Sequence, residues 1–107
     1  MRTAIVTVGT SLLSNAQRSL QKADISDEEV IHYLRTTPAK QATAETNSLS
    51  CLPLQSDDRL NFIYSQTPED ERCAQFLARH YERDGYDVDV VEAQDLLKCI
   101  CGAKLLC

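Results

Sequence analysis

The chain has little of what marks the commonest nucleotide-binding proteins. It holds three glycines in 107 residues, and neither the G-x-G-x-x-G dinucleotide fingerprint nor a P-loop is present. Those motifs need glycine where the backbone approaches a phosphate, so ordinary NAD or ATP binding is disfavoured. Basic residues are also few, with 11 lysines and arginines against 16 acidic residues and a net charge of −5. This balance argues against binding of duplex nucleic acid, but it leaves room for a small nucleotide in a locally positive pocket.

Long apolar runs are absent as well. No run approaches the roughly 20 residues of a membrane-spanning helix. The apolar stretch after Arg2 is too short for a secretory signal and leads directly into Gly9-Thr10-Ser11. We therefore expect a cytoplasmic protein without a membrane partner, and a chain of this length suits one domain.

The cysteines do not have the spacing of an ordinary zinc site. Five cysteines, an odd number in a chain without an export signal, are expected to be reduced thiols. Cys99, Cys101 and Cys107 form the group that suggests a metal. His80 would supply a fourth ligand, but the usual C-x-x-C spacing is missing. We expect neither a metal nor a cofactor.

Strand and helix patterns alternate along the chain. Apolar and β-branched runs predict strands at residues 3–8, 60–65 and 87–92. This alternation predicts an α/β fold, a Rossmann-like three-layer αβα arrangement with a mostly parallel sheet. Three strands fall below the usual number, so the sheet is expected to be incomplete. Helical spacing predicts helices over 11–22, from Ser26 onward with Glu29 as its capping-box partner, from Pro38 to about Leu49, and over 69–84. The last of these has one amphipathic stripe and is expected to end at Asp84-Gly85; the stripe consists of Cys73, Phe76, Leu77, His80 and Tyr81.

The first predicted strand leads into a small turn. Residues 4–8 are apolar enough to form a buried strand, and Gly9 permits a tight turn after it. Thr10 and Ser11 are able to cap the helix that follows. A strand, a small turn and a helix N-terminus together form a place to hold an anion, most often a phosphate. Two interpretations remain open here, because Thr10 and Ser11 either contact a phosphate or ribose or only cap the helix.

Three more polar residues are candidates for the same site. Asn15 lies one helical turn beyond Ser11, where it would contact a base or ribose or would be a surface amide. Gln66 and Thr67 follow the second predicted strand, at the sheet edge that Gly9 also occupies in a parallel arrangement. Thr67 is also an ordinary N-cap, and we favour that interpretation for it.

Three segments in this order resemble the CRISPR-associated Rossmann-fold (CARF) domains of type III CRISPR systems. Residues 8–13 with Asn15 resemble the opening of these domains, and residues 42–49 resemble their "SAE…L" helix. Residues 63–69, with Cys73, Ala74 and Leu77 after them, resemble the second strand and helix of standalone members. The resemblance covers residues 1 to about 97, which is the N-terminal half of such a domain. The chain would then be a single partial CARF-like domain over residues 1–107, with 93–107 as a tail outside the family.

CARF domains sense cyclic oligoadenylates, and some standalone members are ring nucleases that cut this messenger. The resemblance implies binding of cyclic oligoadenylate, with cyclic tetra-adenylate as the expected ring, in antiviral defence. It also implies a homodimer, because a symmetric ring fits on a twofold axis. One alternative is a ring nuclease, in which Ser11 supports metal-independent attack by a ribose 2′-hydroxyl on the adjacent phosphate. The other is a Rossmann-like interaction module without a nucleotide ligand. The candidate ligand-binding residues are Gly9, Thr10, Ser11, Asn15, Gln66 and Thr67.

Two further expectations concern Glu45 and the first strand. An acidic group beside a polyphosphate ring is electrostatically poor, so Glu45 is expected to bind an adenine amine or a structural partner. The first strand has no evident neighbour on one side, and an apolar edge associates in water unless it is covered. We expect at least a dimer that buries the region of residues 3–16, or else a tail, residues 93–107, that covers the edge.

Overall fold

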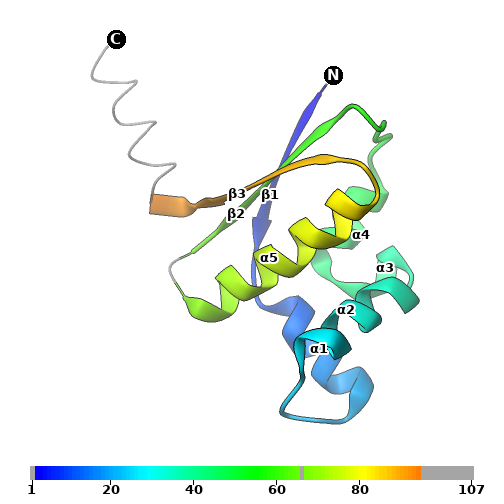
Figure 1. Ribbon diagram of the computed structural model, residues 1–107, viewed down its shortest axis with the longest axis vertical. Coiled ribbons are helices and arrows are strands. Elements are labelled where there is room, and N and C mark those ends of the chain that lie inside the picture. Colours follow the sequence, from blue (N-terminus) through cyan, green and yellow to red (C-terminus); the bar gives the residue numbers. More distant parts are fainter. Residues whose placement is uncertain (1, 66, 95–107) are drawn as a thin grey trace.

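The computed structural model describes residues 2–65 and 67–94. The strands of this part form one parallel sheet in the order β1-β2-β3 (Figure 1). The α/β class and the incomplete, Rossmann-like parallel sheet expected from the sequence are therefore confirmed. The elements in chain order are β1 (Thr3–Val8), α1 (Ser11–Leu20), α2 (Asp27–Thr36), α3 (Ala39–Ala42), α4 (Ala44–Ser50), β2 (Arg59–Tyr64), α5 (Pro68–Arg83) and β3 (Asp87–Glu92).

One face of the sheet carries the helical layer. Both crossovers lead in the same direction across the sheet, so right-handed connections place their helices on the same face. The side chains on that face, including Val8, Leu60 and Phe62, belong to the hydrophobic core. Ile5 points to the opposite face and is 65% exposed. The described residues thus form two layers, one of helices and one of strands.

Strand β1 is less buried than its sequence predicted. Its residues alternate between exposed positions at Thr3, Ile5 and Thr7 and more buried positions at Ala4, Val6 and Val8. The prediction of a buried strand over 4–8 is therefore wrong for Ile5 and Thr7, two of its five residues. The reason is that an apolar run alone cannot distinguish a strand covered on both faces from an edge strand covered on one.

Helix α5 supplies the centre of the core. Four residues of the predicted stripe, Cys73, Phe76, Leu77 and Tyr81, are buried, and the fifth, His80, is half-buried at its margin. The ring of Tyr81 lies 5.8 Å from that of Phe62 on β2, measured between centroids. The helix ends as expected at a glycine, because Gly85 adopts a φ of 97°, which a residue with a side chain rarely adopts.

The helix predicted from Pro38 to Leu49 is instead two short helices, α3 and α4. The chain breaks at Thr43, which adopts extended angles of −148° and 167° and whose hydroxyl accepts a hydrogen bond from the Thr46 N–H. The break frees the carbonyl of Ala42 from helical pairing. That carbonyl accepts hydrogen bonds from the Asn15 amide at 3.0 Å and the Tyr33 hydroxyl at 2.8 Å. A local capping preference and two distant donors together stabilise the break.

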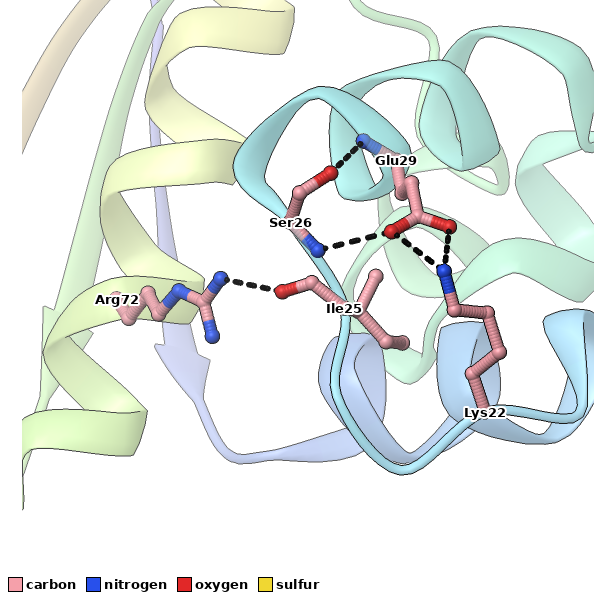
Figure 2. A network of polar contacts seen from close by, with 5 residues as sticks. All are labelled: Lys22, Ile25, Ser26, Glu29 and Arg72. Carbon is pink, nitrogen blue, oxygen red and sulfur yellow. Dashed lines mark hydrogen bonds and ion pairs between the residues drawn. The ribbon is translucent and has the colours of Figure 1, made fainter.

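The connection from α1 to α2 is held by a small polar network. Figure 2 shows Ser26 and Glu29 in the predicted capping box, with Lys22 donating to the Glu29 carboxylate at 2.9 Å. That hydrogen bond from Lys22 is the main reason why the pKa of Glu29 is lowered. Arg72 reaches across from α5 and donates to the carbonyl of Ile25 at 3.1 Å (Figure 2). The network joins the first helices to α5.

Candidate functional site

The candidate site lies at the carboxyl edge of the sheet. β1 ends at Val8 and is followed by Gly9 and helix α1, and β2 ends at Tyr64 and is followed by Ser65 and helix α5. Two helix N-termini therefore begin at one edge, which is where open α/β sheets bind their ligands. The fold brings the Gly9-Thr10-Ser11 turn and Thr67 to this edge, as the parallel arrangement predicted. The predicted contact residue Gln66 lies outside the described residues.

A carboxylate of the chain itself occupies the first turn. Glu45 on α4 accepts a hydrogen bond from the Gly9 N–H at 3.1 Å and another from the Ser11 hydroxyl at 2.9 Å. Its side chain is buried, at 5% exposure. The N-terminus of α1 favours negative charge, and here the chain supplies that charge from α4. Of the two partners expected for Glu45, the described structure contains the structural one.

This carboxylate changes the roles of Thr10 and Ser11. Thr10 is the N-cap of α1 but makes no side-chain capping bond, so the capping interpretation is wrong for this residue. The Ser11 hydroxyl donates to Glu45 and accepts from the Ala44 N–H at 3.3 Å. Ser11 thus joins the turn after β1 to the start of α4, while Thr10 is exposed.

Gly9 is not required for the backbone conformation. Its φ lies outside the left-handed range that favours glycine, and a Cβ built on it meets no atom within 4 Å. The expectation that the tight turn after β1 depends on a glycine, whose missing Cβ would otherwise clash, is therefore wrong. The open space above its Cα leaves the turn accessible from solvent.

The remaining candidates hold the scaffold together. Asn15 is half-buried and donates to the Ala42 carbonyl, which ties α1 to α3. Thr67 accepts from the Asp70 N–H at 3.2 Å as the N-cap of α5, so the favoured interpretation of this residue is confirmed. The Ser65 hydroxyl donates to the Asp70 carboxylate, which is also buried. Each of the two helix N-termini at this edge therefore has a carboxylate beside it.

Cys73 of α5 is buried, and the negative charges of both carboxylates, Glu45 and Asp70, act on its thiol. Burial is the main reason why the pKa of its thiol is raised, and the negative charges of Glu45 and Asp70 raise this pKa further. A hydrogen bond with the Leu13 backbone acts in the opposite direction. A buried thiol with a raised pKa is a poor nucleophile, so Cys73 is a packing residue rather than a catalytic one.

Sequence reasoning did not pair Glu45 with the turn after β1, nor Asp70 with the Ser65 hydroxyl. Asp70 has a local signal, because an acidic residue in the first turn of a helix after a threonine N-cap is typical of a stabilised N-terminus. Glu45 has no such local signal for its contact with Gly9, since the two residues are 36 positions apart. Only the packing of α4 beside β1 creates that pair.

The expectations about a metal site and a membrane-spanning helix concern residues of which the structure describes only a part. Over residues 2–65 and 67–94, no three or more His, Cys, Asp or Glu side chains gather to hold a metal ion. The zinc alternative depended on Cys99, Cys101 and Cys107, which lie outside these ranges. In the same part of the chain, no helix is both long and apolar enough to cross a membrane.

Comparison of the chain with protein-family models and with curated protein sequences finds no match. Any function must therefore be argued from the site. The buried Glu45 carboxylate engages the Gly9 N–H and the Ser11 hydroxyl, and the exposed Thr10 hydroxyl is the neutral polar group that this turn presents. Such an arrangement is suited to positioning a polar ligand rather than to transferring protons, because the acidic group is sheltered from solvent.

Proposed function

We propose that the chain binds cyclic oligoadenylate, with cyclic tetra-adenylate as the preferred ring, as a CARF-type domain in type III CRISPR antiviral defence in the cytoplasm. One observation carries the proposal. The described parts of the segments that resemble CARF domains meet at one edge of the sheet; these parts are residues 8–13, 42–49, 63–65 and 67–69. Glu45 joins the first two directly through its hydrogen bonds to Gly9 and Ser11.

The ligand would approach the outer side of the turn. The open space at Gly9 and the exposed Thr10 hydroxyl offer a surface for a phosphate or ribose. Glu45 and Ala44, the partners of the turn in the described part of the chain, bring no positive charge. A second anion near Glu45 would be repelled, so strong binding requires a cation from a second subunit or from residues outside the described ranges.

The contacts of Ser11 favour binding over cleavage. Its hydroxyl is already engaged by Glu45 and by the Ala44 N–H, so it is not free to stabilise a developing charge without losing these partners. The Glu45 carboxylate is too buried to accept a proton from a ligand hydroxyl. We therefore place the ring-nuclease activity second to binding.

The direct test is calorimetry with cyclic and linear tetra-adenylate. We expect tighter binding of the ring, with no cleavage products when the mixture is chromatographed after incubation without metal. Equal affinity for the two, or binding of neither by a folded protein, would contradict the proposal. Release of linear product would move the assignment to the ring nuclease.

A variant at Gly9 separates the ligand site from the fold. Gly9→Ala places a methyl group in open space without backbone strain, so the thermal midpoint should be unchanged or slightly raised. Binding of the ring should weaken, because the methyl group occupies the approach to the turn. Ser14→Ala, at an exposed position of helix α1, which follows the turn, is the matched control and should change neither property.

A further inference from the structure

Among the described residues, the side of strand β1 opposite β2 has no neighbouring strand, and the hydrogen-bonding groups on that side can be assigned. Within the described residues β1 pairs with β2 only. The Arg59 N–H donates to the Arg2 carbonyl at 2.8 Å, so the backbone N–H and C=O of Arg2 point toward β2. The direction of these groups alternates from residue to residue along a strand, so the backbone groups of Ala4 and Val6 also point toward β2. The N–H and C=O groups of Thr3, Ile5 and Thr7 consequently point outward along the free edge.

The sequence of β1 carries none of the residues that usually protect an edge strand against pairing. Natural edge strands are blocked by lysine, proline, inward charges or bulges. β1 has the sequence Thr-Ala-Ile-Val-Thr-Val, without a charge or a proline. Ile5, at its middle, is one of the few large apolar side chains exposed on the described surface.

A groove gives access to the edge along its length. A cavity of about 350 Å³ lies between β1 and α4, and α4 lines it with Ala44, Glu45, Ser48 and Leu49, while Leu52 lines it from just beyond the helix. Ala44 and Ser48 are four residues apart, so they share one side of α4. Both are small, which permits close approach of another chain. A second cavity, of about 190 Å³, continues past Thr3 toward Pro53.

We propose that β1 pairs with β1 of a second copy of this chain, antiparallel and centred on Ile5. The segment Thr3-Ala-Ile-Val-Thr7 reads nearly the same in both directions. In this register Thr3 lies opposite Thr7 of the second copy, and Ile5 lies opposite Ile5. Threonine pairs and β-branched pairs are favourable cross-strand neighbours, and no like charges meet.

The register also gives hydrogen-bond partners to the backbone groups along the outer edge of β1. In an antiparallel ladder, residues whose N–H and C=O groups face each other exchange both hydrogen bonds. The backbone N–H and C=O groups of Thr3, Ile5 and Thr7 point outward in both copies. In this register each of these residues lies opposite another residue whose backbone groups also point outward. The result is a closed, self-complementary contact and a continuous sheet of about six strands, a usual size.

This pairing is independent of the proposed ligand. Antiparallel strands place the two Gly9 turns at opposite ends of the joined sheet, so each candidate site would act alone. A single ring on the twofold axis, as the CARF resemblance implies, would require a different surface. Association measured without nucleotide therefore tests the pairing separately from the proposed function.

The experiment is a set of charge substitutions at Thr3 and Thr7, followed by sedimentation velocity at tens of micromolar without ligand. Both positions are exposed, so folding should survive, and circular dichroism checks this. We expect the unmodified chain to dimerise. Thr3→Lys/Thr7→Lys and Thr3→Glu/Thr7→Glu should each weaken the homodimer by about tenfold or more, because like charges then lie opposite.

Two further samples decide the register. Thr3→Lys/Thr7→Glu places opposite charges across the contact and should retain the dimer. An equal mixture of the doubly lysine-substituted and doubly glutamate-substituted variants should restore association. A monomeric unmodified chain would overturn the proposal, as would a dimer that none of the substitutions weakens. Failure of the oppositely charged variant or of the mixture to associate would also overturn it.

Discussion

Replacing Ser11 by alanine tests whether a buried carboxylate organises the turn after β1. The substitution removes the hydroxyl that donates to Glu45 at 2.9 Å and accepts from the Ala44 N–H at 3.3 Å. The Gly9 N–H remains as a donor to the other carboxylate oxygen. Ala44 is exposed, so its N–H can turn to water at little cost. The main loss is therefore one donor to a buried charge.

The expected loss can be estimated from that contact. A hydrogen bond to a charged group contributes about 1.5–3 kcal/mol when its removal leaves the partner unsatisfied. Alanine has a slightly higher helix propensity than serine, which offsets about half a kilocalorie per mole. We expect the free energy of unfolding to fall by about 1–2.5 kcal/mol. For a domain of this size, that corresponds to a thermal midpoint lower by about 4–11 °C.

Urea unfolding followed by circular dichroism is the assay, with Ser14→Ala as the matched control. Ser14 lies on the same helix but is exposed, so its substitution should leave stability unchanged or slightly raised. A double-mutant cycle of Ser11→Ala with Glu45→Gln should show coupling of at least about 0.5 kcal/mol. Stability of Ser11→Ala within error of the unmodified protein, or additive effects in the cycle, would refute the role given to Glu45.

Three other predictions follow from titratable groups. Burial lowers the pKa of His80, so the stability associated with its neutral form is present above the unfolded pKa of about 6.5 and is lost as the pH falls toward the lowered value. His80→Gln should flatten the decline in unfolding free energy between about pH 6.5 and 5; an unchanged slope would contradict this. The pKa of Asp58 is lowered, chiefly by the Gln55 N–H, so its contribution is present above about pH 4 and is lost at lower pH. Asp58→Asn should lower stability at neutral pH and reduce the acid sensitivity, which acid titration would measure. Iodoacetamide should label the exposed Cys51 rapidly and the buried Cys73 only in urea, as read by peptide mass spectrometry; equal native labelling would argue against the core position of Cys73.

The sequence alone determined those features that depend on neighbours within one element. The spacing of Cys73, Phe76, Leu77 and Tyr81 predicted the buried side of α5, because helical period and burial are linked directly. The capping box of Ser26 and Glu29 was likewise predicted, since both partners lie within one turn. The alternation of these helices with apolar runs was enough to predict a parallel α/β sheet.

Tertiary structure decided what depends on contacts between distant segments. The break at Thr43 persists because Asn15 and Tyr33, from other helices, donate to the carbonyl that the break exposes. The exposure of Ile5 follows from the position of β1 at the edge of a sheet covered on one face, which a local apolar pattern does not reveal. The turn at Gly9 resembles an empty anion site in the sequence, yet it holds Glu45. The N-terminus of α1 attracts any nearby negative charge, and only the folded arrangement determines which charge is nearest.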